Sequence, residues 1–167
     1  TSLVNEIIEI AHVKNKKVTA AVFPFPEMSR QMVRQAWNDW NLDTAYPMLY
    51  QNFYRENINW IGFATKQGVS DVDFPIISGL YAPALRDPKD LEKAILIAKE
   101  NGAKGISIFT ADGLTKEQQA VFVKLKNEKK IDMSARGIRY WKNLIFRTSS
   151  PIYGKARKLY SCSTSFL

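Results

Sequence analysis

The chain has 167 residues, of which 46% are hydrophobic and 24% charged, and its net charge is +8. This is the composition of one globular domain with enough apolar material for a core, but the length is short of the roughly 250 residues of a complete (β/α)₈ barrel. No apolar run reaches membrane-spanning length, and the single Cys162 excludes an internal disulfide framework or a cysteine-based zinc site.

The positive charge is concentrated at the carboxyl-terminal end. Residues 129–167 contain nine Lys or Arg and one acid, Asp132, whereas residues 1–128 hold fifteen of each sign. The sequence therefore divides into an α/β region, 1–128, and a basic tail, 129–167. Three interpretations of the tail remain open: an extra β-rich element, a disordered basic arm, or a stretch unrelated to the domain.

Four segments each end a strand-like apolar run and then lead into a helix. Their starts lie about thirty residues apart, which is the length of one strand with its crossover helix. Repeated units of this kind build a parallel (β/α) barrel or a doubly wound sheet. The segments are Lys17–Pro26, Leu42–Gln51, Phe74–Pro83 and Ala103–Leu114. Four units are half of the eight that make a barrel, so we expect a fragment whose natural start lies upstream.

The first two units are expected to alternate helix and strand. Residues 2–15 have helical apolar spacing, and Val18–Phe23 is an uninterrupted apolar run, typical of a strand covered on both faces. Ser29 is placed to cap a helix that extends to Asn41. The apolar face of that helix would contain Met32, Val33, Ala36, Trp37 and Trp40.

The remaining elements follow the same rhythm. Asp87-Pro88 is a strong helix start, and Thr115 is placed to cap the last helix. The expected strands are Leu42–Tyr50, Phe74–Tyr81 and Lys104–Thr110, and the expected helices run from Phe53 to Gly68, from Asp87 to Asn101 and from Thr115 to Asn127.

One string resembles a known family. Residues 33–50 read VRQAWNDWNLDTAYPMLY. They resemble a segment of glycosylhydrolase-like TIM barrels, bacterial proteins of the family-10 glycosylhydrolase type, in which an Arg-Gln-Asp-Trp-like helix end precedes a strand reading Leu-Asp-x-x-x-Pro-Met-x-Tyr. Ala36 stands where that family often has Asp. Further similarity lies in Lys17–Pro24, Gly79–Tyr81 and Gly102–Phe109, so the resemblance covers about residues 3–126 and not the tail. The resemblance implies that these residues are strands five to eight of a TIM barrel with their helices, which is a half-barrel fragment of an α/β fold.

The resemblance implies a carbohydrate-active protein, a glycoside hydrolase in its intact form, that is secreted or periplasmic. Active sites of such barrels lie at the carboxyl ends of the strands, and hydrolysis needs two carboxyl groups. Glu27 and Asp112 are the candidate catalytic pair. The alternative role for Glu27 is that of a favourable negative charge in the first turn of a helix. The alternative for Asp112 is a place in an Asp-Gly turn. Because Gly79–Tyr81 ends without a carboxylate, we expect the chain alone to be inactive.

Aromatic residues near strand ends are candidates for sugar binding, because sugar C–H faces stack on rings. The predicted substrate-binding residues are Phe23, Tyr50, Gln51 and Tyr81. Core packing is the alternative for each ring. Asp39 and Asp43 precede a strand. This places them at the amino-terminal ends of the strands, opposite the expected active site, where a structural role is expected.

The expected partner is an oligosaccharide or polysaccharide. A non-catalytic sugar-binding or scaffold domain is the first alternative, and nucleic-acid binding by the aromatic and basic tail is a second, disfavoured one. The sequence predicts no cofactor, since it has no glycine-rich phosphate loop and His12 is isolated. Unpaired strand edges at Lys17–Phe23 and Lys104–Thr110 predict self-association.

Overall fold

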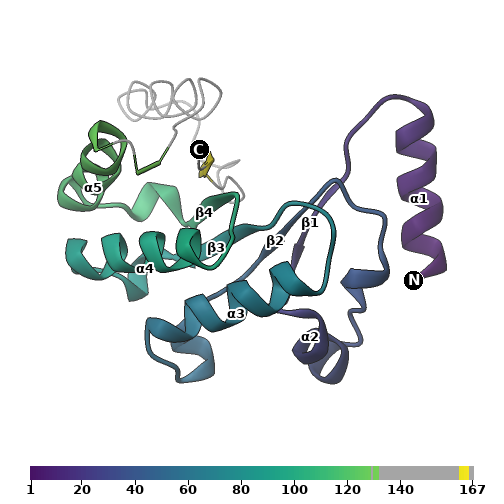
Figure 1. Cartoon of the computed structure of the whole chain (residues 1–167), viewed down its shortest axis with the longest axis horizontal. Coiled ribbons are helices and arrows are strands. Elements are labelled where there is room, and N and C mark those ends of the chain that lie inside the picture. Colours follow the sequence, from purple (N-terminus) through teal and green to yellow (C-terminus); the bar gives the residue numbers. More distant parts are fainter. Residues whose placement is uncertain (129, 132–161, 166–167) are drawn as a thin grey trace, which may run out of the picture.

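The computed structural model describes residues 1–128, 130–131 and 162–165. They form a mixed α/β fold, in which α1 lies at one end of a row of strands and α5 at the other (Figure 1). The helices and strands are α1 Ser2–Val13, β1 Thr19–Val22, α2 Pro26–Val33, β2 Thr44–Pro47, α3 Asn59–Ser70, β3 Ile77–Tyr81, α4 Pro88–Glu100, β4 Gly105–Phe109, α5 Lys116–Asn127 and β5 Cys162–Ser165. Short 3₁₀ turns are η1 Trp37–Asp39, η2 Gln51–Tyr54, η3 Ala82–Ala84 and η4 Ala111–Gly113.

The strands pair in parallel, as the βαβ rhythm predicts. β1 pairs with β2, and β3 pairs with β4 so that Tyr81 lies opposite Phe109. Two isolated parallel bridges, Ala45 with Ile76 and Met48 with Gly79, place β2 beside β3. The strands of the described part form open sheets and no closed barrel.

The prediction of an unpaired edge at Lys104–Thr110 is wrong. β5 runs antiparallel along β4, with Gly105 opposite Ser165 and Ile108 opposite Cys162. The backbone groups of β4 therefore have partners on both sides. The outer edge of β1 has no strand partner among the described residues. Apart from β5 and from Lys130 and Ile131, the predictions for the basic tail concern residues outside the described ones.

The expected helix from Ser29 to Asn41 is also wrong. The helix, α2, begins three residues earlier at Pro26 and ends at Val33, where Arg34 adopts a left-handed conformation with φ of 58°. Ser29 lies buried inside α2, and its Oγ accepts a hydrogen bond from Trp37 Nε1 at 3.0 Å. Trp37 lies in a 3₁₀ turn and not in a helix. Its indole is buried because the chain reverses direction after α2 and brings the ring back onto that helix.

Helix starts with polar caps agree with the sequence. The Asp87 side chain accepts the N–H of Lys89 at 2.8 Å, with Pro88 as the first helical residue. Thr115 and Gln118 form a reciprocal capping box at the start of α5. These local signals are confirmed because each depends on contacts within a few residues.

Two groups of buried side chains form the core. The larger one packs α3, α4 and α5 on β3 and β4, and it extends to Ile131. The smaller one holds Ile8 of α1, Val22 of β1 and Trp37 together. The helix α1 thus reaches the core through a single fully buried side chain, Ile8.

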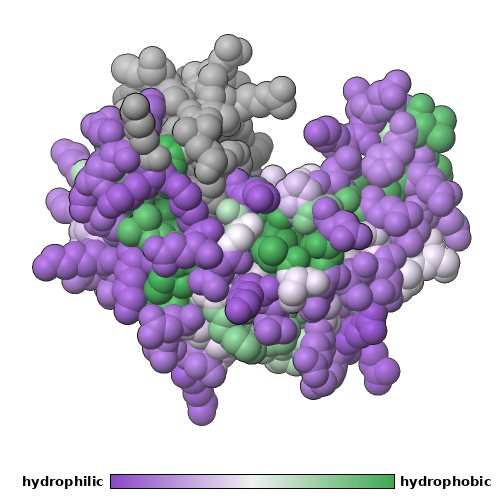
Figure 2. Space-filling model, in the orientation of Figure 1, coloured by the Kyte–Doolittle hydropathy of each residue, from purple (hydrophilic) through white to green (hydrophobic). Residues whose placement is uncertain are grey.

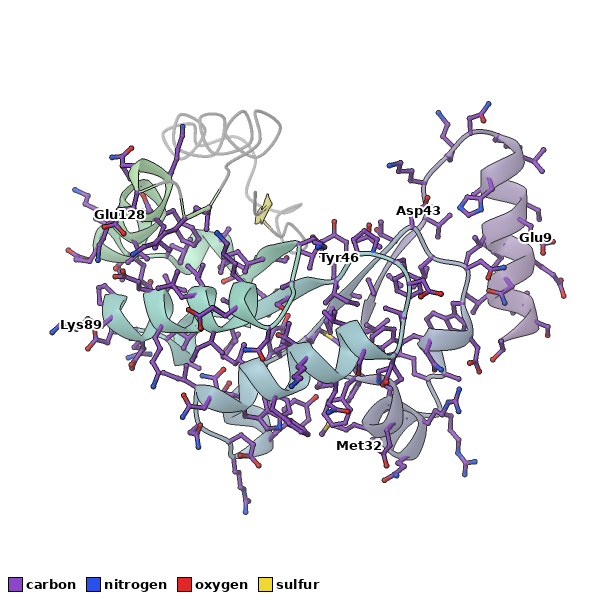
Figure 3. All side chains as sticks on the ribbon, viewed as in Figure 1. Glu9, Met32, Asp43, Tyr46, Lys89 and Glu128 are labelled. Atoms are coloured by element: carbon purple, nitrogen blue, oxygen red, sulfur yellow. The ribbon has the colours of Figure 1, made fainter. Side chains whose placement is uncertain are left out.

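Apolar side chains also lie on the surface. Figure 2 shows apolar patches on an otherwise polar face, including some on α1 at the right of the view. Figure 3 shows how the side chains line these elements, with Glu9 projecting from α1. None of the helices in the described part of the chain is both long enough and apolar enough to cross a membrane.

Candidate functional site

Four aromatic rings meet where β2, β3 and β4 end. Tyr50 follows β2, Phe53 lies in η2, and Tyr81 and Phe109 are the last residues of β3 and β4. Ring centroids of Tyr50 and Tyr81 lie 5.5 Å apart, those of Phe53 and Tyr81 5.3 Å, and those of Tyr50 and Phe109 5.8 Å in a stacked arrangement. These four residues are called the ring cluster below.

Parallel pairing explains why the rings converge. Strands that run in the same direction bring their carboxyl ends to one edge, and the register sets Tyr81 directly opposite Phe109. The bridge between Met48 and Gly79 aligns β2 with β3, so that Tyr50 arrives at the same edge. Gly79 permits this approach, since a Cβ there would lie 2.8 Å from the Pro47 carbonyl oxygen.

The ring cluster is open to solvent on part of its surface. Phe53 is 64% exposed and Phe109 38% exposed, whereas Tyr50 and Tyr81 are half-buried. Exposed phenylalanines at the end of a strand do not contribute fully to a core. The arrangement instead presents apolar ring surface beside two phenol groups.

Burial next to two other phenols changes the chemistry of Tyr50. Desolvation, with smaller contributions from Tyr54 and Tyr81, raises the pKa of Tyr50 to about 12. The pKa of Tyr54, which packs on Trp60 at 5.0 Å, is also raised by burial. Tyr50 therefore keeps its proton, and remains a hydrogen-bond donor, to a higher pH than an ordinary phenol.

Gln51, a predicted substrate-binding residue, follows Tyr50 and is only 5% exposed. Its backbone N–H donates to Leu49 and its carbonyl accepts from Glu56. The side-chain Oε1 is buried without a hydrogen-bond partner in the described part of the chain. Because this oxygen is enclosed, a ligand on the surface does not reach it in this conformation.

The predicted catalytic carboxylates lie apart from these contacts. Glu27 is exposed in the first turn of α2, where the helix dipole favours a negative charge, and Asp112 is exposed in η4. Within the described residues, neither carboxylate makes a contact with the ring cluster that is close enough to be a hydrogen bond or ion pair. Their catalytic roles remain predictions.

Phe23, the fourth predicted binding residue, does not join the ring cluster. It is half-buried, and its backbone N–H donates to Gln35 Oε1 at 2.8 Å. The amide of Gln35 thereby holds the loop after α2 against the end of β1. The structure gives Phe23 a position at the same strand end but no ring contact with Tyr50 or Tyr81.

Sequence reasoning missed half of the ring cluster. Phe109 is the last residue of β4, whereas the sequence predicts a strand that continues to Thr110. The sequence predicts a helix that begins at Phe53, whereas Phe53 lies in the short turn η2 directly after Tyr50. The density of aromatic letters in residues 50–54 was the available signal.

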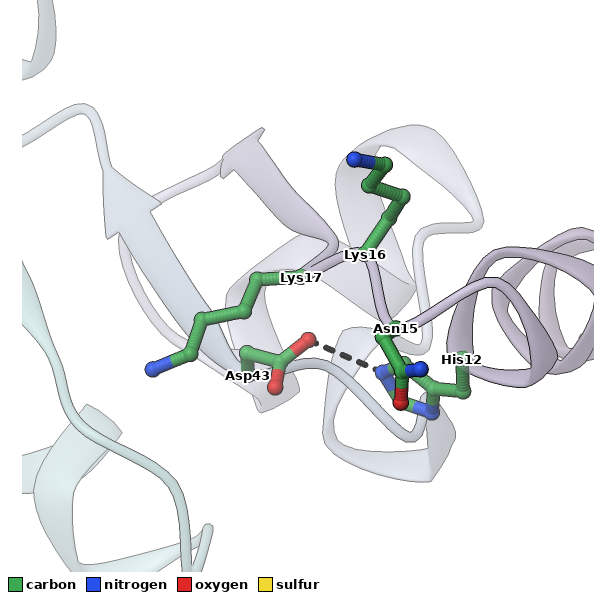
Figure 4. A pocket seen from close by; sticks show the side chains of 5 residues that line it. All are labelled: His12, Asn15, Lys16, Lys17 and Asp43. Carbon is green, nitrogen blue, oxygen red and sulfur yellow. Dashed lines mark hydrogen bonds and ion pairs between the residues drawn. The ribbon is translucent and has the colours of Figure 1, made fainter.

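A shallow depression lies at the opposite end of the strands from the ring cluster (Figure 4). It is lined by His12, Asn15, Lys16, Lys17 and Asp43. Asp43 Oδ2 accepts the N–H of Val18 at 2.7 Å and lies 2.9 Å from His12 Nε2. The bond from Val18 and then that from His12 lower the pKa of Asp43. These contacts join α1 to the strands, which is the structural role expected for Asp43.

Neighbouring Asp39 is also used for structure, since it forms an ion pair with Arg30 at 2.9 Å. Among the described residues, no group of three His, Cys, Asp or Glu side chains is arranged to hold a metal ion. Comparisons with protein-family models, with curated proteins and with solved structures found no match to this chain.

Proposed function

We propose that this chain binds a glycan at the ring cluster. The observation that carries the proposal is the convergence of Tyr50, Phe53, Tyr81 and Phe109 from three adjacent strand ends, with Phe53 and Phe109 exposed. Sugar rings present C–H faces that pack on aromatic rings, and phenols donate hydrogen bonds to sugar hydroxyls.

The wider architecture is proposed to be four successive units of a TIM barrel, strands five to eight. The parallel pairs and the bridges between β2 and β3 give the order β1, β2, β3, β4, as consecutive barrel strands require. The resemblance of residues 33–50 to glycosylhydrolase-like barrels supports the same assignment. Binding sites of such barrels lie at the carboxyl ends of strands, where the ring cluster lies.

Binding is better supported than hydrolysis. A general acid for glycoside cleavage needs a carboxyl group kept protonated near neutral pH, which usually requires apolar surroundings. Glu27 and Asp112 are both exposed. The proposal therefore stops at recognition of the glycan, and the two carboxylates are candidates for contacts with sugar hydroxyls.

The test is titration calorimetry of the full chain with neutral oligosaccharides: cello-, xylo-, malto- and chito-oligomers. We expect at least one to bind, and we expect Phe53→Ala and Phe109→Ala each to weaken binding about tenfold, since an aromatic contact contributes about 1 kcal/mol beyond area burial. Phe63→Ala is the matched control, because Phe63 is 52% exposed on α3 and contacts Phe25 instead.

Binding that survives both substitutions, or the absence of binding to every oligomer, would contradict the proposal. Turnover of aryl-glycosides that is lost in Glu27→Gln and Asp112→Asn would replace recognition by hydrolysis as the function. Circular dichroism of each variant shows whether a loss of binding comes from unfolding.

A further inference from the structure

The outer edge of β4 is covered by a strand from the far end of the chain. β5 runs antiparallel to β4, with Gly105 opposite Ser165 and Ile108 opposite Cys162. It lies on the side of β4 away from β3, as the strand order β3, β4, β5 requires (β5 is yellow in Figure 1). Among the described strands β5 alone lies on this side, so its four residues close the edge.

The direction of the backbone groups in β3 follows from its contact with β2. The Gly79 carbonyl accepts the N–H of Leu49 at 2.9 Å, so the backbone groups of Gly79 face β2. Backbone groups of successive residues point to opposite sides of a strand. The N–H and C=O groups of Ser78 and Leu80 therefore face β4.

The register then identifies the groups of β4 that face β5. Ser78 lies opposite Ile106. In a parallel pair, Ser78 bonds the residues on either side of its partner, which are Gly105 and Ser107. The N–H and C=O groups of Ile106 and Ile108 therefore point the other way, toward β5.

The same alternation orients the backbone of β5. Ile106 lies opposite Thr164, and Ile108 lies opposite Cys162. Opposite residues of an antiparallel pair exchange two hydrogen bonds when their backbone groups face each other. The N–H of Thr164 is thus directed at β4, and that of Ser163, one residue earlier, is directed away from it.

The edge of β4 would be a template for another strand if it were uncovered. Residues 105–108 are buried, with Ile106 0% and Ile108 1% exposed. The bare edge of such an apolar strand presents a row of unpaired N–H and C=O groups to other chains. At the open edge of β1, by contrast, Thr19 and Ala21 are exposed. A short strand of sequence Cys-Ser-Thr-Ser is a poorer template than the edge that it covers.

We propose that β5 guards the β4 edge within one chain, and that this edge pairs with the β4 edge of a second copy when β5 is displaced. A two-fold axis sets two identical edges antiparallel, which is the direction in which β5 already pairs. With the axis at Ser107, Ile106 lies opposite Ile108 of the partner subunit. The groups that face β5 in one chain then face each other across the dimer.

The test compares two proline variants of the full chain at neighbouring positions. Thr164→Pro removes a donor that faces β4, so β5 should detach. Ser163→Pro is the matched control, because an edge strand tolerates proline where the N–H points away from its neighbour. In sedimentation equilibrium over about three decades of concentration, Thr164→Pro should dimerise with a dissociation constant at least about tenfold below that of wild type and of Ser163→Pro. The open edge of β1 is the same in all three proteins.

Amide hydrogen exchange followed by NMR shows whether the β4 edge is the one used. In Thr164→Pro at low concentration, the Ile106 and Ile108 amides should exchange at least about tenfold faster than in wild type. The Ser107 amide, which bonds β3, should stay protected, and this shows that the sheet remains folded. At high concentration the protection of Ile106 and Ile108 should return, because the second copy replaces β5.

Wild type provides a readout that needs no substitution. Its Ile106 and Ile108 amides should exchange faster than that of Ser107, since a four-residue edge strand opens before the sheet does. Equal exchange of the three amides in wild type would overturn the proposal, as would unchanged protection in Thr164→Pro. A Thr164→Pro chain with exposed amides that stays monomeric, or equal association of Ser163→Pro, would also overturn it.

Discussion

His12 Nε2 lies 2.9 Å from Asp43 Oδ2, and the two residues are 31 positions apart in the sequence. The same carboxylate oxygen accepts the N–H of Val18, at the start of the β1 segment. One acidic side chain therefore joins α1, β1 and β2 at their adjoining ends (Figure 4).

The stability of this junction should depend on acid pH. The Val18 and His12 bonds lower the pKa of Asp43 below its usual 3.8, so the folded state favours the ionised form. The stabilisation is complete above this ordinary, unfolded-state pKa and is lost as the pH falls through the lower folded pKa. Between pH 5 and 2, the melting temperature of wild type should fall more steeply than that of Asp43→Asn. Parallel curves of melting temperature against pH for wild type and Asp43→Asn would exclude this role. The control is Asp73→Asn, because Asp73 lies in an exposed loop.

Ser29→Ala should destabilise the smaller core. Trp37 Nε1 donates to Ser29 Oγ at 3.0 Å, and both side chains are fully buried. The alanine variant leaves the indole N–H without an acceptor, which costs about 1–3 kcal/mol of unfolding free energy. Urea denaturation measures the loss. Ser70→Ala, at an exposed hydroxyl, should change stability by less than about 0.5 kcal/mol. An equally small change at Ser29 would mean that the indole finds another partner.

Gly62→Ala should destabilise the packing of α3 on α4, although alanine is the better helix former by about 1 kcal/mol. An added Cβ would lie 2.5 Å from Ile97 Cγ2 and 2.8 Å from Asn101 Nδ2. Such overpacking costs about 1–3 kcal/mol, so the clash should exceed the gain in propensity. The measurement is the urea midpoint.

The control for Gly62→Ala is a glycine with more room. At Gly113 the nearest atom to an added Cβ is Thr110 Oγ1 at 3.3 Å, so Gly113→Ala should be nearly neutral. The double variant Gly62→Ala, Ile97→Ala should be less destabilised than the sum of the two single variants, because the second change removes the obstructing methyl group. Simple additivity would show that this contact does not limit the packing.

Alkaline titration should reveal Tyr50. Its pKa is raised to about 12, so in the folded chain it should lose its proton later than an ordinary phenol. Between pH of about 10 and 12 the unfolded chain ionises this group and the folded chain does not, so stability should fall as the pH rises. Tyr50→Phe should remove one late-titrating phenol from the ultraviolet titration and flatten the pH dependence. An unchanged titration curve would contradict the burial of Tyr50 among Tyr54 and Tyr81.

Local signals in the sequence were sufficient for several elements. Asp87 and Thr115 cap helices through contacts within three residues, and the apolar runs before Phe23, Tyr81 and Thr110 are strands because continuous apolar runs suit parallel strands. The sequence also predicts that Tyr50 and Tyr81 lie at strand ends, and the structure has Tyr50 just after β2 and Tyr81 at the end of β3. For these features, the information lies in neighbouring residues of the chain.

Contacts between distant residues decided the rest. The helix predicted from Ser29 to Asn41 ends at Val33, since the Trp37 indole packs back on Ser29. The partner of β4 is β5, a strand from the far end of the chain that pairs with it antiparallel. Because β5 has few apolar residues, its sequence shows no alternation of apolar and polar residues that would predict a strand.

The sequence by itself determined the repeated strand–helix units, the charge division at residue 128 and two of the four clustered rings. Only the tertiary structure decided that Phe53 and Phe109 complete that cluster, that Asp43 holds α1, and that one face of α1 is left apolar and exposed. Periodicity shows which side of an element is apolar. Which neighbour covers that side depends on strand register and on the path of the chain, because these bring residues from different units together.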